Sequence, residues 1–339
     1  MTDVPMREEW PKLAMSHELS SADYYFDSRA HYGAYQDMLH DTPSMGSMRK
    51  AILQNKHLFR DKTVLVVGCG LSIVPILASQ AGASRVFAHT AYAIGDFTEM
   101  AAARNNFTNI EMIRGDIRTV SLPVEQVDII LCELGGCFLF YESKLEEYLI
   151  ARDRFLTVGG LLFPDYAEMC VAGITDYEER RSREAKFRNL WGCDLRDLQE
   201  ASNREPLIDF VAEENIITKS SSVFTIDLYT APSDILTQVP VAGQFNIEVS
   251  QRSTLGGLVF WFDMYYRSGH VPVWYTTSPH CTATTWKQTV LTLQKALTVT
   301  PEDEVVGRFA IRRGKGRELE VKLSYSLGSK SQTEFYRLP

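Results

Sequence analysis

Residues 64–73 are VLVVGCGLSI, a short apolar run followed by two closely spaced glycines. The run Val64–Val67 predicts a buried strand of a parallel sheet. The G-x-G spacing of Gly68 and Gly70 predicts a turn in which the backbone passes close to a ligand. The sequence therefore predicts a nucleotide-binding strand and glycine loop.

The residues that usually handle the ligand are missing around this loop. Ser72 stands where a third glycine is expected. Thr90 ends the next strand-like run, VFAHT, where an acidic residue usually holds a ribose hydroxyl. We therefore expect a cofactor fold without its cofactor and a function that is expressed through a partner.

Bulk composition narrows the class of protein. The chain has 339 residues, 45% hydrophobic and 23% charged, with a formal net charge of −8. This acidic balance disfavours nucleic acid and suits basic protein substrates. No apolar run approaches the ~20 residues of a membrane span, and we expect a cytoplasmic protein. The six cysteines form no C-x-x-C pair and the histidines show no ligand spacing, so we expect reduced thiols and no metal site.

The pattern of the chain changes three times. Strand-like and helical stretches alternate over 61–165, which predicts βα units and a parallel sheet. Later runs such as SSVFTIDLYT and LVFWFDMYYR predict an antiparallel sheet or barrel. We expect a poorly ordered N-terminus over 1–23, helices over 24–60, a degenerate Rossmann-like domain over 61–165 and a β-rich domain over 166–339.

Two carboxylates follow the predicted strand VDIILC. Glu133 comes directly after it, and Glu142 nine residues later. A loop at the carboxyl edge of a parallel sheet can bring such carboxylates together, where they can clamp a guanidinium. On spacing alone, two solvated surface glutamates are the better interpretation.

Four stretches resemble the protein arginine N-methyltransferase family: YYFDSRAHYGAYQDMLHD, LPVEQVDIILCELGGCFLFYESKL, ARDRFLTVGGLLFPD and TTWKQTVL. The resemblance runs from Tyr24 to the C-terminus, with the motifs in family order. It implies a seven-stranded S-adenosylmethionine-dependent methyltransferase domain, then an antiparallel β-barrel with a helical dimerisation arm at about 177–205. It also implies a head-to-tail dimer, and we expect Phe187, Leu190 and Trp191 to carry part of the interface.

The chain departs from the family pattern around the cofactor. The resemblance implies that Val66 replaces an acidic residue of the first strand and that Ser72 replaces a glycine of the loop. It implies that Thr90 replaces the glutamate that binds the ribose, and Ser44 the arginine that binds the methionine carboxylate. Arg118 replaces the glutamate that binds the adenine amino group. Further replacements are Arg29 in the first of the four stretches and Thr285 in TTWKQTVL. Leu134, Gly135 and Cys137 are replacements in the loop from Glu133 to Glu142, which we call the double-glutamate loop. We therefore expect Gly68 and Gly70 to remain in a degenerate site that binds no cofactor.

These departures resemble those of a prozyme, a catalytically inactive subunit that activates an active arginine methyltransferase paralogue. On this interpretation the chain is not an enzyme, Glu133 and Glu142 are retained without catalysis, and the partner binds S-adenosylmethionine. One alternative is an active S-adenosylmethionine-dependent arginine methyltransferase with an unusual cofactor pocket. Another is a scaffold that presents arginine-rich substrates without affecting catalysis.

Overall fold

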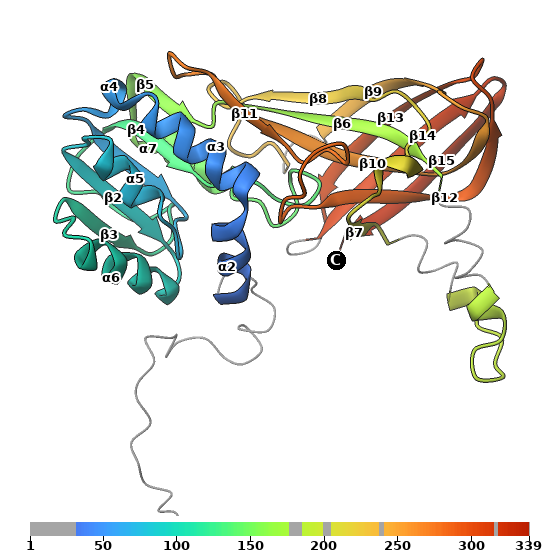
Figure 1. The fold of residues 1–339 in the computed structure, drawn as a ribbon, viewed down its shortest axis with the longest axis horizontal. Helices are drawn as coiled ribbons and strands as arrows, with labels where there is room; N and C mark the ends of the chain where they lie inside the picture. The colour runs from blue at the N-terminus through green and yellow to red at the C-terminus, as the bar shows by residue number, and fades with distance from the viewer. Residues whose placement is uncertain (1–31, 176–184, 199–204, 237–240, 315–317, 339) are drawn as a thin grey trace, which may run out of the picture.

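The computed structural model describes residues 32–175, 185–198, 205–236, 241–314 and 318–338. Figure 1 shows an elongated molecule with a parallel sheet and its helices at one end and long antiparallel strands at the other. The N-terminal segment expected over 1–23 lies outside the described residues, as do Arg29 and parts of the arm expected over 177–205.

A five-stranded parallel sheet has the order β3-β2-β1-β4-β5. Its strands are β1 (Thr63–Val67), β2 (Arg85–Thr90), β3 (Ile110–Arg114), β4 (Val127–Cys132) and β5 (Leu156–Phe163). The apolar run of β1 is buried from Val64 onward, because β2 and β4 flank it on both sides. The chain reverses its direction of travel across the sheet between β1 and β4, the place where open α/β sheets bind ligands.

Helices pack around this sheet. They are α2 (Tyr32–His40), α3 (Thr42–Leu53), α4 (Lys56–Phe59), α5 (Val74–Gln80), α6 (Asp96–Arg104) and α7 (Leu145–Phe155), with a 3₁₀ turn η2 (Ala93–Gly95). Helix α3 contacts both α5 and a strand of the antiparallel half, and Figure 1 shows it between the two halves. Asn55 reinforces that junction, since its side-chain amide accepts from Val271 N–H and donates to Val271 O. The N-terminal helices therefore join the two halves of the molecule.

Two antiparallel sheets form the second half. The first contains β6 (Tyr166–Ile174), β7 (Leu207–Asp209), β8 (Ser221–Asp227), β10 (Ser253–Tyr266), β11 (Val273–Thr276) and β12 (Gln288–Val299). The second contains β9 (Val241–Glu248), β13 (Glu304–Arg313), β14 (Leu319–Leu327) and β15 (Lys330–Leu338). Contacts of β8 with β9 and of β12 with β15 bring the sheets together around a shared core. A further 3₁₀ turn, η3 (Glu213–Asn215), lies between β7 and β8.

The Rossmann-like domain followed by an antiparallel barrel is confirmed, but the described parallel sheet has five strands where seven were expected. The reason lies at the end of β5. After the turn at Pro164 the chain enters β6, which pairs with β8 and β10 of the other half instead of returning to the parallel sheet.

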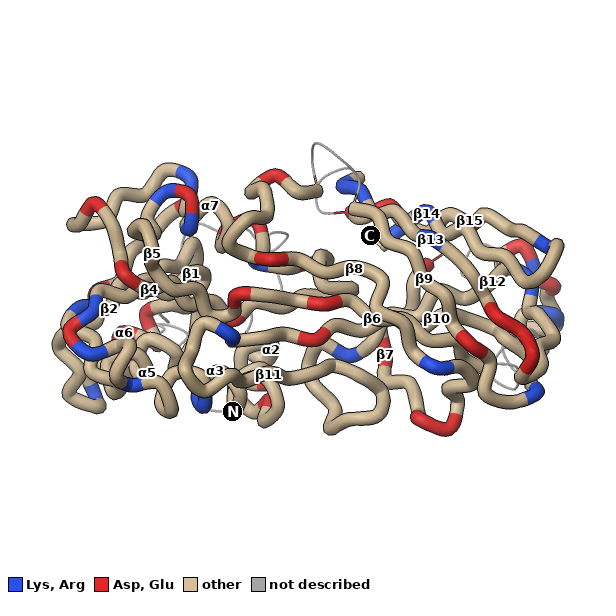
Figure 2. The backbone as a smooth tube through the Cα atoms, turned by 90° about the horizontal axis from the view of Figure 1, so that it is seen from above, with Lys and Arg blue, Asp and Glu red and all other residues tan. Residues whose placement is uncertain are grey.

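Charged residues are distributed over both halves. Figure 2 shows the acidic and basic residues of the described part of the chain interspersed along the tube. Among the described residues, no helix is long and apolar enough to cross a membrane.

Candidate functional site

The glycine loop follows β1 in the expected conformation. Gly68 and Gly70 have φ values of +60° and +49°, which glycine adopts readily. Gly68 N–H donates to His89 Nδ1 at 3.2 Å, and the other ring nitrogen of His89 lies 2.9 Å from Gly115 O. Nδ1 must then be the acceptor and Nε2 the donor. Burial lowers the pKa of His89, which favours this neutral form.

His89 therefore supports the loop where the family pattern has an acidic residue in the first strand. Val66, at that position, is buried core. Sequence reasoning singled out the loss at Val66 but missed His89. Its position, one residue before Thr90 at the end of β2, was the available signal.

Helix α2 lies directly against the loop. A Cβ placed on Gly70 would fall 2.0 Å from Tyr35 Oη, so the tyrosine occupies the space beside the glycine. Tyr35 itself is buried, with 3% of its surface exposed. The close backbone approach that Gly70 permits is thus used by a side chain of the same protein.

Thr90 is buried and its hydroxyl bonds within its own turn. It accepts from Tyr92 N–H at 3.1 Å and contacts Tyr92 O at 3.2 Å. The Thr90 methyl group would lie 2.5 Å from a Cβ on Gly95, which shows how closely η2 covers it. The hydroxyl is thus engaged within its own turn, and it lacks the charge of a carboxylate that would accept from a ribose diol.

Ser72 organises the start of α5. Its hydroxyl accepts from Val74 N–H at 3.0 Å and donates to Glu133 Oε1 at 2.8 Å. Its N–H donates to Thr98 Oγ1 at 2.9 Å. The serine thus links the glycine loop to the first glutamate of the following motif.

Glu133 is half-buried at the carboxyl end of β4. Burial raises its pKa, and this effect outweighs the opposing influence of Lys144 and of the Ser72 hydrogen bond. Lys144 precedes α7 and is buried, with 6% of its surface exposed. Within the described part of the chain, Lys144 Nζ has no hydrogen-bond partner.

Glu142 has different surroundings. It lines a cleft of about 210 Å³ with Arg118, Glu146 and Arg313. Glu146 bridges the two arginines, 2.9 Å from Arg118 Nη2 and 2.6 Å from Arg313 Nη2. Arg118, expected near an adenine, is therefore engaged in ion pairs. Glu133 bonds to the glycine-loop side and Glu142 faces this cleft, so the described geometry does not present them as one clamp.

The loop between the two glutamates is held in an unusual backbone conformation. Phe138, Leu139 and Glu142 all have positive φ, between +54° and +62°. Phe138 packs edge-on against Phe260, with ring centroids 5.0 Å apart. Positive φ in a bulky residue is a true outlier, and such strain concentrates at functional sites.

Two further departures from the family pattern have visible packing consequences. A Cβ on Gly135 would lie 2.5 Å from the Trp286 ring, so the indole fills the space beside this residue. Thr285 donates through both N–H and hydroxyl to Asp41 Oδ2, at 2.8 and 2.9 Å. Asp41 also accepts from Ser44 N–H as the N-cap of α3. Asp41 thus caps α3 through Ser44 N–H, and its bonds with Thr285 fix that helix to the TTWKQTVL stretch.

The described part of the arm, residues 185–198, lies apart from the barrel (Figure 1). Trp191 is 95% exposed and Leu190 38% exposed, while Phe187 is half-buried. Trp191 therefore does not pack within its own barrel. Whether these residues form an interface stays a prediction.

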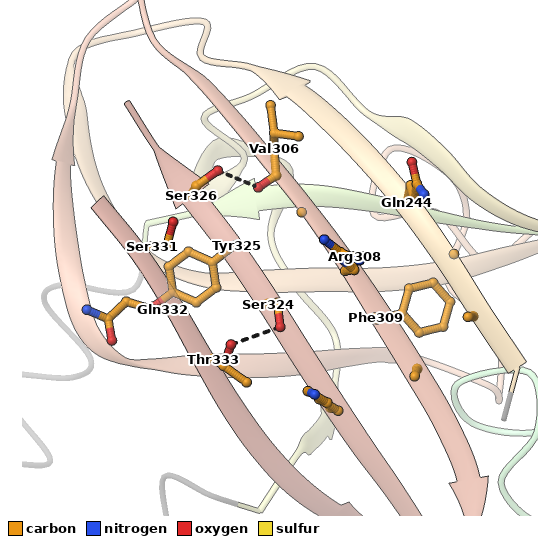
Figure 3. A pocket seen from close by; sticks show the side chains of 15 residues that line it. Gln244, Val306, Arg308, Phe309, Ser324, Tyr325, Ser326, Ser331, Gln332 and Thr333 are labelled. Carbon is orange, nitrogen blue, oxygen red and sulfur yellow. Dashed lines mark hydrogen bonds between the residues drawn. The ribbon is translucent and has the colours of Figure 1, made fainter. Parts of the chain in front are cut away.

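A hollow of about 820 Å³ lies on the four-stranded sheet, over β9, β13, β14 and β15 (Figure 3). Two of its hydroxyl side chains are hydrogen-bonded within the hollow: Ser324 bonds the Thr333 hydroxyl at 2.9 Å, and Ser326 donates to the backbone carbonyl of Val306 at 3.4 Å. We assign it no chemistry. No group of three or more potential metal ligands occurs in the part of the chain that the structure describes.

The residues present do not fit S-adenosylmethionine as arranged. The glycine turn is retained, but Tyr35 covers Gly70, Thr90 is closed on its own turn and a buried ammonium lies beside Gly68. A sulfonium cofactor would meet a covered loop, no carboxylate for its ribose at Thr90 and a like charge at Lys144.

Known proteins resemble the chain over nearly its whole length. Residues 165–330 match the family model described as arginine methyltransferase oligomerization subdomain. Protein arginine N-methyltransferase 8-B of Danio rerio is 33% identical over 98% of this chain and 79% of its own length. Protein arginine N-methyltransferase 1 of Schizosaccharomyces pombe is 35% identical over 93% of each.

Solved structures agree. A chain of the Trypanosoma brucei PRMT1 enzyme–prozyme heterotetrameric complex with AdoHcy is 32% identical and superposes with a TM-score of 0.87, covering 92% of this chain and all of that one. Arabidopsis thaliana protein arginine methyltransferase 10, in an open conformation, is 26% identical with a TM-score of 0.82, covering 92% and 99%.

The expectation that the chain is not an enzyme is contradicted by these comparisons. Relatives 33–35% identical over nearly all of it are named as protein arginine N-methyltransferases. The prediction gave the missing cofactor contacts more weight than the retention of the whole architecture. The specific identity of a prozyme is not confirmed.

Proposed function

Since the chain belongs to the protein arginine N-methyltransferase family, we propose that it acts in S-adenosylmethionine-dependent methylation of protein arginine residues, with an unusual cofactor crevice. The observation that carries this proposal is Glu133, which keeps its place at the carboxyl end of β4 in a strained loop that ends at Glu142. Family membership supplies the expected reaction, and the Glu133 carboxylate supplies a group that can bind a guanidinium.

Glu133 would orient the substrate. Burial raises its pKa, but a substrate guanidinium would favour the carboxylate form, as an opposite charge does. Two parallel N–H···O bonds from arginine to a carboxylate fix both position and plane. The carboxylate would also stabilise the positive charge on the substrate while one nitrogen is exposed for reaction. The residues present do not fit the cofactor, so we assign Glu133 no part in methyl transfer itself. Its proposed role is to bind and orient the guanidinium.

The test is transfer of a labelled methyl group from S-adenosylmethionine to an arginine-rich peptide. Wild type, Glu133→Gln and the matched control Glu214→Gln would be assayed alone and with a second family member. Glu214 is exposed in η3, far along the chain from the glycine loop. We expect Glu133→Gln to lower the rate by about 100-fold and Glu214→Gln to leave it unchanged. No transfer by wild type in either setting would refute the proposal.

A second candidate function is regulation of a companion subunit, favoured by the match to a chain of a heterotetrameric complex. Residues 165–330 match a family model described as an oligomerization subdomain, and Trp191 within this range is almost fully exposed. Both observations are compatible with a surface that binds another chain. We propose an arginine methyltransferase paralogue as the companion. This role is independent of whether the chain itself transfers methyl groups.

The companion role predicts that adding this chain raises the turnover of a co-expressed paralogue beyond the sum of the separate rates. Glu133→Gln should retain this effect if it passes through the interface, whereas Trp191→Ala should lose it. Additive rates in a mixture that co-elutes as one complex would argue against regulation.

A further inference from the structure

Lys144 lies inside the crevice where a doubly wound sheet binds its ligand. The aliphatic part of its side chain runs beside the glycine loop, with Cδ 2.9 Å from the position of a Cβ on Gly68. Gly68 follows β1, and Glu133 follows β4, the two strands between which the chain reverses its direction across the sheet. Ligands of such sheets bind at the carboxyl ends of these strands.

The Lys144 ammonium is buried and makes no hydrogen bond within the part of the chain that the structure describes. Only 6% of the surface of Lys144 is exposed. A buried, unpaired ammonium is costly unless opposite charges lie near it. Glu133 and Glu147 supply such charges, and the carboxylate of Glu147 reaches within 3.5 Å of the same Gly68 position.

Lys144 stays positively charged in this environment. Burial alone would lower its pKa, but the neighbouring Tyr35 hydroxyl and the Glu133 carboxylate act in the opposite direction, and the pKa is raised. The same ammonium acts on Cys69, Cys132 and His89, which surround the loop. The positive charge therefore belongs to the crevice and not to the surface.

We propose that Lys144 determines the ligand specificity of the crevice by serving as an internal cation beside Glu133 and Glu147. S-adenosylmethionine carries a sulfonium, and its demethylated product S-adenosylhomocysteine carries a neutral thioether. A fixed ammonium repels the first and not the second, and it neutralises carboxylates that would otherwise attract a cation. Of the two ligands, the crevice consequently disfavours the sulfonium more, and Lys144 is one reason why the residues present do not fit S-adenosylmethionine. This inference rests on the proposed function, because that function places adenosyl ligands in this crevice.

Calorimetric titration of the full chain with each ligand tests the inference. We expect wild type to bind S-adenosylhomocysteine at least about tenfold more tightly than S-adenosylmethionine. Lys144→Met keeps a side chain of similar length and removes its charge. It should reduce the ratio of the two dissociation constants, mainly by strengthening the binding of S-adenosylmethionine. Lys144→Arg retains the charge and should retain the ratio. The exposed Lys56→Met makes the same change outside the crevice and should also retain it.

The outcomes separate the inference from the proposed function. Wild type that binds both ligands equally refutes the inference whether or not the variants fold, while the bound ligands leave the proposed function standing. An unchanged ratio in a folded Lys144→Met chain refutes it as well. If wild type binds neither ligand, S-adenosylmethionine binding gained by Lys144→Met supports the inference. Failure of both chains to bind either ligand overturns both the inference and the proposed crevice.

Discussion

His89 shows how one side chain can hold a glycine loop without a charge. Its acceptor nitrogen binds Gly68 N–H and its donor nitrogen binds Gly115 O. Protonation of Nδ1 would place two N–H donors against each other at the loop. The loop is therefore built on the neutral imidazole, which makes it sensitive to mild acid.

The pH dependence of stability tests this arrangement. The pKa of His89 is lowered by burial in the folded chain, against about 6.5 in an unfolded one. Between these two values the unfolded state binds the extra proton, so stability falls as the pH drops below about 6.5 and stops falling below the folded pKa. His89→Gln keeps an acceptor and a donor but does not titrate. We expect the melting temperature of wild type to fall more steeply than that of His89→Gln as the pH is lowered from about 7.5 to 5.5. Parallel losses would contradict a buried neutral His89.

Lys144 and Ser72 show the limit of reasoning from the sequence at this scale. A lysine in the stretch YESKLEEYL is expected in solvent, since lysine is almost never fully buried. Its burial results from contacts with the glycine loop, which lies more than 70 positions earlier and which no local pattern encodes. Ser72 was correctly noted as a missing glycine, but its bond to Glu133 depends on the tertiary fold.

At the scale of elements, α2 and the glycine loop form one packed unit. The contact is between Tyr35, which precedes β1 in the sequence, and Gly70, which follows it. Any ligand that reaches the loop must therefore displace part of α2.

A double-mutant cycle measures this contact. Gly70→Ala should lower the free energy of unfolding by about 1–3 kcal/mol, because its methyl group would fall on the Tyr35 ring tip. Tyr35→Ala should relieve part of that cost, by roughly 0.5 kcal/mol or more, leaving the strain of alanine at positive φ. Denaturant unfolding of the four chains provides the values. Additive changes would show that α2 does not cover the loop.

The double-glutamate loop depends on Gly135 in a comparable way. Gly135→Ala should destabilise the chain by about 1–3 kcal/mol, since the new Cβ would lie 2.5 Å from Trp286. Gly46→Ala is the matched control: it lies within α3 with nothing within 4 Å, and alanine there should stabilise the helix by about 0.5–1 kcal/mol. Equal responses in denaturant unfolding would contradict the packing at Trp286.

Regular elements were predictable where the pattern was local. The apolar runs VLVV and VDIILC became β1 and β4 because each is buried between two neighbours. The loop from Glu133 to Glu142 was not, because three residues in it adopt positive φ and Phe138 packs into the barrel. Spacing alone favoured two solvated surface glutamates, but in the structure Glu133 is half-buried and bonded to Ser72, whereas Glu142 lines the cleft with Arg118 and Arg313.

At the scale of the molecule, Glu146 ties the two halves together. It lies on α7 and binds Arg118, which follows β3, and Arg313, which ends β13 of the barrel. The cleft beside Glu142 is thus bounded by both domains. A substrate bound there would contact both halves, so their relative position contributes to the site.

The arm provides the last test, at the level of assembly. An indole with 95% exposure is unusual on a monomer, and tryptophan anchors dominate many interfaces. We expect Trp191→Ala to weaken association with a second family chain by about 2 kcal/mol or more, which is at least roughly 30-fold in the dissociation constant. Trp274→Ala, at a 57% exposed site on β11, is the matched control and should leave association unchanged. Sedimentation velocity over a dilution series measures both. If Trp191→Ala associates as wild type does while remaining folded, the arm is not the interface, and the companion role must act through another surface.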